Sequence, residues 1–377
     1  MSILVVCPRF APDTGGIETL LAQVLPELST RGLEIVVAAG TGREDHAPVE
    51  VLDGIPVYRI PFDLPMHSAK PAGILEAAHR IRMIEADHEV RIRHVHGFGD
   101  IGLWYALRAH QRRPLPLVVS VHGTFESLGR LAPSAEKLLR AADVVTAVSG
   151  PVRSAVYEAI PDLAAEVRLI PNGLRFVDTA PTTRPVAGQL LGVGRLLEQK
   201  GFDIAVEALA RLRATHPSCQ LMIAGDGQCA DAIRRQAKRS GVASRVHLLG
   251  NISREDMRRA MNDASIVLVP SRHTEGFSLA ALEAAHAARP VIASGIGGLV
   301  ETVENGVTGL LVPPDDPGAL ARAIARMLDD PVGAAAMGQV AHERARERFA
   351  FERCVDAYHG LYVELDSPAL LSTASRV

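Results

Sequence analysis

Cysteine is scarce in this sequence, and its spacing excludes several kinds of site. Among 377 residues there are four cysteines, and no two of them form a C-x-x-C pair. Scattered single cysteines are typical of proteins in a reducing compartment that carry no structural zinc. We therefore expect a cytoplasmic protein in which no metal is bound by its cysteines, Cys7, Cys219, Cys229 and Cys354.

Strong net charge and long apolar runs are also lacking. The formal net charge is −3 at pH 7, so no overall positive field favours nucleic acid as a partner. No apolar run reaches the roughly 18 residues of a transmembrane helix. The first residues form a strand pattern without the basic flank of a signal peptide. Acidic residues offset the basic ones near 79–82 and 137–140, which predicts at most weak contact with a membrane surface.

Acidic metal-binding motifs are missing as well. No Asp-x-Asp pair occurs, so nothing marks a site for Mg²⁺ or Mn²⁺. His94 and His96 share one face of a predicted strand, but no further ligand follows at zinc-site spacing. Structural histidines are therefore favoured over a metal site. We expect no essential metal and no tightly bound cofactor.

Strand patterns alternate with amphipathic helical patterns along most of the chain, which is typical of parallel α/β sheets. The polar, proline-bearing stretch Asp178–Pro185 interrupts the alternation and predicts a linker. The fold class predicted is α/β, with two Rossmann-like, doubly wound domains at residues 1–178 and 186–349. Ligands bind such sheets at the carboxyl ends of the strands, so a deep cleft between the two domains is the expected site.

The most informative motif is a run bracketed by two glutamates, Glu275 and Glu283. It follows the strand pattern at 266–270 and leads into an alanine-rich helical pattern. The start of a helix offers free backbone N–H groups and a partial positive charge, which suit a phosphate. Carboxylates cannot hold that phosphate, so we expect them to accept hydrogen bonds from hydroxyl groups on the molecule that carries it. A nucleotide sugar fits this description.

Glycines and cations follow other predicted strands. Gly15 and Gly16 can bring backbone N–H groups close to a phosphate, although such a pair is more often a plain turn. Arg195 ends a strand and Lys200 lies in the next loop, and two such cations suit a diphosphate. Because the chain has only four lysines, we favour this role over that of solvated surface cations. His122 also ends a strand, where a catalytic position competes with that of a buried structural histidine.

Together these motifs resemble glycosyltransferase family 4, whose members are retaining, nucleotide-sugar-dependent enzymes of the GT-B fold. The resemblance covers nearly the whole chain and is strongest from Leu190 to Pro314. The motifs that carry it are Gly15-Gly16, His122-Gly123, Gly194-Arg195, Lys200-Gly201, Ala224-Gly225-Asp226-Gly227, Glu275-Gly276-Phe277 through Glu283, and Asn305-Gly306 through Gly309.

The resemblance implies a role for each motif. The first domain would bind the acceptor, with a C-terminal helix at about 350–377 packing back on it, and the second would bind the donor. Ser278 stands where the family often has glycine, a mild departure that could narrow donor choice. Arg195 and Lys200 would hold the donor diphosphate with the backbone of Gly15 and Gly16, Glu275 the sugar hydroxyls and Glu283 the ribose, His122 would lie near the reacting carbon, and Gly276, Phe277, Ser278 and Leu279 would complete the donor site.

The reaction implied is transfer of a sugar with retention, from a nucleotide diphosphate sugar to a hydroxyl acceptor, and a UDP-sugar is the leading expectation. We expect metal-independent, same-face substitution, because the one candidate nucleophile, Glu275, is assigned to binding. A polysaccharide, a glycolipid and an antibiotic or other secondary-metabolite core all stay open as acceptor, and so does the oligomeric state. The alternatives are a GT-B sugar phosphorylase, a nucleotide-sugar epimerase and a non-catalytic nucleotide-sugar-binding protein.

Overall fold

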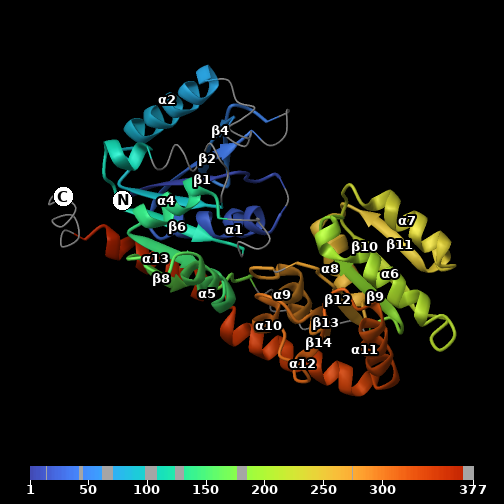
Figure 1. Ribbon diagram of the computed structural model, residues 1–377. Helices are drawn as coiled ribbons and strands as arrows, with labels where there is room; N and C mark the ends of the chain where they lie inside the picture. The colour runs from blue at the N-terminus through green and yellow to red at the C-terminus, as the bar shows by residue number, and fades with distance from the viewer. Residues whose placement is uncertain are drawn as a thin grey trace. The chain divides into compact units, whose positions relative to one another are not determined.

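The computed structural model describes residues 1–13, 15–41, 46–61, 71–97, 108–123, 131–175, 185–273 and 275–367. The chain divides into two compact units. Unit 1 comprises Met1–Gly173 and Phe351–Val377, and unit 2 comprises Leu174–Ala350. Each unit contains a sheet of mainly parallel strands with helices packed against it, which confirms the predicted α/β class (Figure 1). The predicted linker at 178–185 lies outside the described residues except for Pro185.

The sheet of unit 1 has eight strands in the order β3-β4-β2-β1-β5-β6-β7-β8. Only the β3–β4 pair is antiparallel. The chain runs from β1 outward to β2 on one side and later returns to place β5 on the other, so the strand order reverses between β1 and β5. The strands are β1 Ser2–Cys7, β2 Glu34–Gly40, β3 Val49–Leu52, β4 Ile55–Ile60, β5 Ile92–His96, β6 Leu117–Val121, β7 Val144–Ala147 and β8 Glu166–Leu169.

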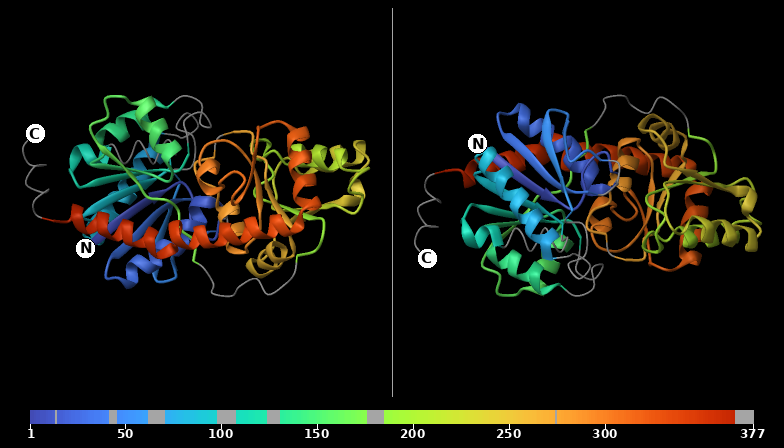
Figure 2. Two further views of the ribbon diagram at one scale, coloured as in Figure 1. Left: turned by 90° about the horizontal axis from the view of Figure 1, so that it is seen from below. Right: turned by 90° about the horizontal axis from the view of Figure 1, so that it is seen from above.

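The last helix of the chain, α13 (Phe351–Leu365), belongs to unit 1. Its apolar residues recur every three or four positions and pack with α1 against one face of the sheet, as Figure 2 shows for the red helix beside the blue strands. Arg31 and Arg168 also bind carboxylates of α13, at 2.5 Å from Asp356 and 2.6 Å from Glu364. The other helices with printed bounds in this unit are α1 Gly16–Thr30, α2 Pro71–Asp87, α4 Pro133–Ala141 and α5 Gly150–Ala159.

The sheet of unit 2 has six strands, all parallel, in the order β11-β10-β9-β12-β13-β14. The strand order reverses between β9 and β12, and the carboxyl ends of the strands at such a point are where open α/β sheets bind ligands. The strands are β9 Gln189–Val193, β10 Gln220–Ala224, β11 Val246–Gly250, β12 Ile266–Val269, β13 Val291–Ser294 and β14 Gly309–Val312.

Helices cover the sheet of unit 2. Alternating strand residues divide its buried apolar side chains into two clusters, one on each face of the sheet. A third, alanine-rich core joins α9 to α12, where Ala285 packs with Ala341 and Ala345. Among the described residues, no helix is long and apolar enough to cross a membrane. The helices are α6 Phe202–Arg211, α7 Ala230–Arg239, α8 Arg254–Asp263, α9 Leu279–His286, α10 Leu299–Thr302, α11 Pro317–Asp329 and α12 Pro331–Arg348, with short 3-10 turns η1 Glu198–Lys200 and η2 Ala243–Arg245.

Candidate active site

An ion pair between Lys200 and Glu275 lies beside the reversal point of the unit 2 sheet. Lys200 ends the turn η1 after β9, and Glu275 follows β12. Lys200 Nζ donates to Glu275 Oε1 at 2.6 Å, and the two side chains are only 27% and 12% exposed. Ser271 Oγ donates to the same carboxylate oxygen. Of the residues the structure describes, none donates to Oε2, so Glu275 is anchored through one oxygen and presents the other.

The backbone of Glu275 is fixed by the loop after β13. Gly298 N donates to the carbonyl oxygen of Glu275 at 2.7 Å. A Cβ at position 298 would lie 2.0 Å from the carbonyl oxygen of Gly276, a distance that no side chain tolerates. Gly298 is therefore required for the close approach of the two loops, and the sequence analysis missed it. The Gly-Gly pair after a strand is the same signal that drew attention to Gly15 and Gly16.

Arg272 fixes the turn that carries Lys200, and the sequence analysis missed it too. Its backbone N donates to the carbonyl of Gln199 at 2.9 Å, and its Nη1 donates to the carbonyl of Glu198 at 3.0 Å. Its guanidinium also makes a forked contact with Asp203, at 2.6 and 2.5 Å, the strong geometry for an arginine and a carboxylate. The signal was available, since Arg272 follows a strand as Arg195 does.

Gly201 completes the support of this turn. Its backbone φ is +67°, in the left-handed region that glycine adopts without strain. A Cβ there would lie 2.0 Å from the carbonyl oxygen of Pro270, at the end of β12. The turn with Lys200 and the strand end before Glu275 are therefore packed backbone to backbone, which holds the ion pair in place.

Arg195, the other predicted cation, is placed differently. It follows β9, its side chain is exposed, and it forms no ion pair with any residue that the structure describes. The two cations are thus not equivalent. Lys200 is neutralised by Glu275, whereas the guanidinium of Arg195 is available to a ligand.

The start of α9 uses Ser278 as its N-cap. Ser278 is buried, and its Oγ accepts a hydrogen bond from Ala281 N at 3.3 Å. The hydroxyl therefore satisfies a helix N–H group, which is the usual function of serine at this position. Gly276 and Phe277 precede the cap and Leu279 opens the helix, so the predicted donor-binding run spans the entry into α9.

Glu283 lies one turn into α9 and carries an unusual carboxyl group. This carboxyl group forms no hydrogen bond or ion pair with any other described residue, and the loss of water around it raises its pKa to about 7. A carboxylate in such surroundings needs hydrogen-bond donors that the described chain does not supply. Hydroxyl groups of a ligand would supply them.

In unit 1, Gly15 and Gly16 open α1 at the carboxyl end of β1. Gly15 has extended backbone, and none of the described side chains caps the helix, so the first N–H groups of α1 have no side-chain acceptor in that part of the chain. Glu18 lies in the same first turn. The arrangement has the free donors that a phosphate needs, and the phosphate role of this turn stays a prediction.

His122 follows β6 and contacts a second histidine. Its Nε2 lies 2.9 Å from Nδ1 of His96, the last residue of β5, and the two rings stack with centroids 5.2 Å apart. Burial lowers the pKa of His122 to about 4 and that of His96 well below 6.5, so both rings are neutral near pH 7. The described residues contain no cluster of histidines, cysteines or carboxylates with the geometry of a metal site.

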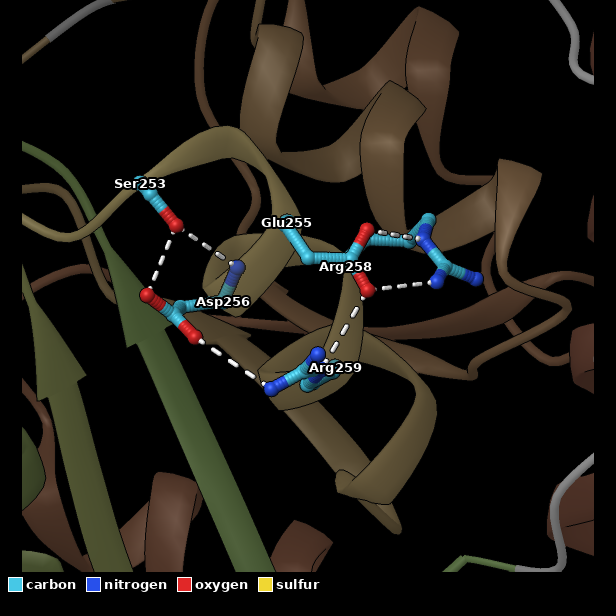
Figure 3. A network of polar contacts seen from close by, with 5 residues as sticks. All are labelled: Ser253, Glu255, Asp256, Arg258 and Arg259. Atoms are coloured by element: carbon cyan, nitrogen blue, oxygen red, sulfur yellow. Dashed lines mark hydrogen bonds and ion pairs between the residues drawn. The ribbon is translucent and has the colours of Figure 1, made fainter.

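A second charged network lies outside the candidate site and is more exposed to solvent. On α8, Glu255 binds Arg258 and Arg259 while Ser253 and Asp256 bond at the helix start (Figure 3). These side chains are more than half exposed where they form ion pairs, at 51% for Glu255 and 66% for Arg259. They are contacts within one solvated helix surface, unlike the Lys200–Glu275 pair between two loops.

The structure thus brings Lys200 together with Glu275, and the entry of α9 with the loop after β13. It places Arg195 and Glu283 without partners among the described residues, and it places His122 and Gly15–Gly16 in unit 1. Four loops of the first domain would form the acceptor groove. Those at 61–70, 98–104 and 125–131 lie outside the described residues except for Pro61 and Leu131, whereas the loop at 10–15 is described except for residue 14.

Known proteins resemble this chain along its whole length. The family model described as Glycosyltransferase Family 4 matches residues 14–176, and that described as Glycosyl transferases group 1 matches residues 187–330. Glycogen synthase of Mycobacterium tuberculosis is 30% identical, and the alignment covers 96% of this chain and 94% of that protein.

Solved structures agree with these matches in fold. Sucrose-phosphate synthase from Thermosynechococcus elongatus has a TM-score of 0.83 at 24% identity, covering 97% of this chain and 99% of that one. Anabaena HepE in complex with UDP and glucose has a TM-score of 0.79 at 22% identity, covering 97% and 100%. Because models of the family match both of its units and a relative is 30% identical over nearly its full length, the chain belongs to glycosyltransferase family 4 and is a glycosyltransferase of the GT-B fold.

Proposed function

We propose that this enzyme transfers a sugar from a UDP-sugar to a hydroxyl group of a carbohydrate acceptor, with retention at the transferred carbon. The observation that carries the proposal is the anchored Lys200–Glu275 pair at the reversal point of the unit 2 sheet, close in sequence to the unpaired Arg195. The UDP complex of HepE supports the choice of donor base. The names of the glycogen and sucrose-phosphate synthases support a carbohydrate acceptor.

Cationic groups would stabilise the leaving diphosphate. When the bond between sugar and phosphate breaks, negative charge grows on the departing oxygen, and fixed donors aimed at that charge are usually the largest catalytic contribution. Arg195 offers a guanidinium that pairs with no carboxylate among the described residues. Lys200 has three N–H groups, of which one is used by Glu275, so two can reach a phosphate. We propose on this basis that the two side chains neutralise the diphosphate without a metal ion.

Glu275 would act as a hydrogen-bond acceptor for the sugar. Its Oε1 is held by Lys200 and Ser271, while Oε2 accepts no bond from the described chain. A double displacement needs a free carboxylate nucleophile and a second acid–base group about 5–5.5 Å away. A carboxylate held by a lysine and a serine is a weak nucleophile. Glu275 therefore fits the binding of a sugar hydroxyl better, and the proposed chemistry is same-face attack by the acceptor, with a donor phosphate oxygen taking the proton.

Glu283 would bind the ribose hydroxyls of the nucleotide. A carboxyl group with a pKa raised to about 7 gains most from ligand donors that stabilise its ionised form. Two adjacent hydroxyls can both donate to one carboxylate. The roles expected of His122, Gly15 and Gly16 toward the donor stay predictions of the same proposal.

A thermal-shift panel tests the donor directly. UDP, GDP, ADP and their common sugar conjugates are added to the full chain, and the melting temperature is measured. A ligand of the native state stabilises it by RT ln(1 + [L]/Kd), so we expect the largest shift with a UDP-sugar. The matched controls are Lys200→Ala, which should lose most of the shift, and the exposed Lys238→Ala, which should keep it.

Turnover assays separate the alternatives. With the donor from the panel and a carbohydrate acceptor, we expect release of the nucleotide and a product of retained configuration, in the presence of a chelator as well as without it. An absolute need for inorganic phosphate without any nucleotide would instead identify a phosphorylase. Conversion of the donor without acceptor would identify an epimerase. Binding without any nucleotide release would identify a non-catalytic protein, and loss of activity with the chelator would refute the metal-independent chemistry.

A further inference from the structure

A column of polar side chains runs through unit 1 beside the strand ends. His94 and His96 lie on β5, Ser120 lies on β6, and His122 follows β6. The rings of His94 and His96 are 0% and 1% exposed, and their centroids are 3.9 Å apart. Three neighbouring imidazoles in one core are costly to bury, because each ring nitrogen needs a partner. The hydrogen-bond partners of these nitrogens therefore indicate which of them carry a hydrogen atom.

His94 is fully paired and fixes the inner end of the column. Its Nδ1 lies 2.5 Å from the hydroxyl of Tyr362 on α13, and its Nε2 lies 2.7 Å from Ser120 Oγ. Burial raises the pKa of Tyr362 well above 10, so the phenol keeps its proton, and among the described residues His94 Nδ1 is the one acceptor for it. His94 Nε2–H then donates to Ser120, whose hydroxyl lies 2.6 Å from Thr146 Oγ1. The tautomer of His94 is thereby set.

The contact between His96 and His122 holds a single proton. Both rings are neutral, so of the two facing nitrogens, His96 Nδ1 and His122 Nε2, one carries hydrogen and the other accepts it across 2.9 Å. The two remaining nitrogens, His96 Nε2 and His122 Nδ1, are buried and have no hydrogen-bond partner among the described residues. Two arrangements are thus possible, and they differ in which outer nitrogen bears a hydrogen atom.

Burial distinguishes the two arrangements. If His122 donated, His96 would bear its own hydrogen on Nε2, an unpaired N–H at a ring that is 1% exposed. Buried N–H groups without an acceptor are rarer than acceptors without a donor. If His96 Nδ1–H donates instead, His96 keeps only an unpaired acceptor at Nε2. The unpaired N–H then lies on Nδ1 of His122, a nitrogen that is itself buried but belongs to a half-buried residue, whereas His96 is buried as a whole.

We propose that His96 is a positioning residue, which donates a hydrogen bond to Nε2 of His122 and so holds His122 as the Nδ1–H tautomer. His122 then presents an N–H group to an oxygen atom of the nucleotide sugar. That oxygen belongs to a sugar hydroxyl or to a phosphate, and both accept hydrogen bonds. This rests on the proposed function only for the identity of that oxygen. The tautomer itself is a property of the free protein, so it can be measured without any substrate.

The first test is nitrogen NMR of the full chain labelled with ¹⁵N-histidine. Long-range proton–nitrogen spectra distinguish a protonated ring nitrogen from a bare one, and the His122→Asn variant identifies the His122 signals by their loss. We expect wild-type His122 to be protonated on Nδ1 and bare on Nε2. A protonated Nε2 on His122 would overturn the proposal, whatever reaction the enzyme catalyses.

Two variants of His96 test whether the contact is the cause. His96→Leu removes the donor, and we expect His122 to shift toward the Nε2–H form. His96→Asn keeps an amide N–H near the position of Nδ1, and we expect it to preserve the wild-type tautomer. An unchanged His122 spectrum in His96→Leu would show that other contacts set the tautomer. If His96→Leu does not fold, the wild-type spectrum and His96→Asn still decide.

Turnover of UDP-glucose, or of the donor that the thermal panel selects, gives the functional readout. We expect His96→Leu to lower kcat by about 10- to 100-fold, by analogy with the loss of a partner that orients a metal-binding histidine. The Kd for UDP should not change, and His96→Asn should recover most of the rate. His88→Leu is the control, because His88 also makes a side-chain hydrogen bond through a ring nitrogen in unit 1, to the Tyr58 hydroxyl at 2.9 Å, but away from the strand ends. An equal loss of kcat in His88→Leu would refute a specific role for His96.

Discussion

The two units place different chemistry at the reversal points of their sheets. Unit 2 has charged groups there, with Lys200 bound to Glu275 and Arg195 left unpaired. Unit 1 has neutral imidazoles, because burial lowers the pKa of His96 and His122 far below neutral pH. Charged groups form strong contacts with a phosphate, whereas neutral rings can only exchange single hydrogen bonds with a polar group.

The two units should also respond differently to substitutions. An anchored ion pair fails when either partner is removed, since the other charge is left without compensation. The neutral, hydrogen-bonded histidines of unit 1 lose their function when a donor and an acceptor are exchanged, because the ring then offers a lone pair where an N–H was needed. Substitutions that remove a charge should therefore lower the activity most when they lie in unit 2. Substitutions that keep the shape of a side chain but change the tautomer of a histidine should lower it most when they lie in unit 1.

The strongest expected effect comes from Glu275→Gln. The change keeps the shape of the side chain but removes the charge that pairs with Lys200 and accepts from the sugar. We expect kcat to fall by about 10²–10³, the scale of losing one preorganised polar contact at a reacting centre, with little change in the Kd for UDP. Steady-state kinetics and calorimetry measure the two quantities. Glu207→Gln, which removes an exposed pair with Arg211, is the control and should leave both unchanged. A covalent sugar adduct trapped on Glu275 would contradict the assigned role.

Glu283→Gln should stabilise the free protein while weakening nucleotide binding. The pKa of Glu283 is raised from 4.5 to about 7, so below pH 4.5 the carboxyl is protonated in both folded and unfolded states and contributes nothing. As pH rises from 4.5 to 7 the folded state holds more protons than the unfolded state, and stability falls. Above pH 7 the full penalty, up to about 3 kcal/mol, is present.

Glutamine removes that penalty because it does not ionise. We therefore expect Glu283→Gln to raise the free energy of unfolding at pH 8 and to leave it unchanged at pH 4, as measured by denaturant titration. The Kd for UDP should rise in the same variant if the carboxylate binds the ribose. Equal behaviour of Glu275→Gln and Glu283→Gln in these two assays would contradict the division of roles between them.

Arg272→Ala should loosen Lys200 without removing any charge at the ion pair itself. Arg272 bonds to the carbonyl of Glu198 and to Asp203, so the turn η1 loses its support. We expect kcat to fall by about tenfold, less than the 10² that an ångström of misplacement can cause. Arg245→Ala is the control, because Arg245 also bonds to two backbone carbonyls of unit 2, those of Cys219 and His216, away from Lys200. A comparable fall in kcat for both variants would mean that only general stability was lost.

Sequence patterns located the buried strands well, because a strand covered on both faces reads as a continuous apolar run. They missed β3, whose residues alternate between exposed and half-buried, with Val51 67% exposed. The turn residues Asp53 and Gly54, both with positive φ, are the hairpin signal that was available. They also missed α12, because its buried residues are mostly alanine and glycine and form little apolar contrast.

The site was predictable to the level of strand ends but not of contacts. Lys200 and Glu275 were both selected, yet their ion pair joins residues 75 positions apart, and no local pattern encodes it. Arg272 was missed because arginine is common in this chain and its partners are backbone carbonyls. His96 was interpreted as structural, and it is buried as expected. What the sequence could not show is that its Nδ1 faces Nε2 of His122 at 2.9 Å.

The smallest effect is expected on α8, where the paired charges are exposed to water (Figure 3). Arg258→Ala removes a forked contact with Glu255, and solvent screens such pairs, so we expect no measurable change in melting temperature or kcat. Ser253→Ala in the same network should lower stability by about 1 kcal/mol, because Ser253 Oγ accepts from Asp256 N and caps the helix. Denaturant titrations of the two variants give the comparison. A larger loss from Arg258→Ala than from Ser253→Ala would show that burial is not what separates the Lys200–Glu275 pair from the ion pairs of α8.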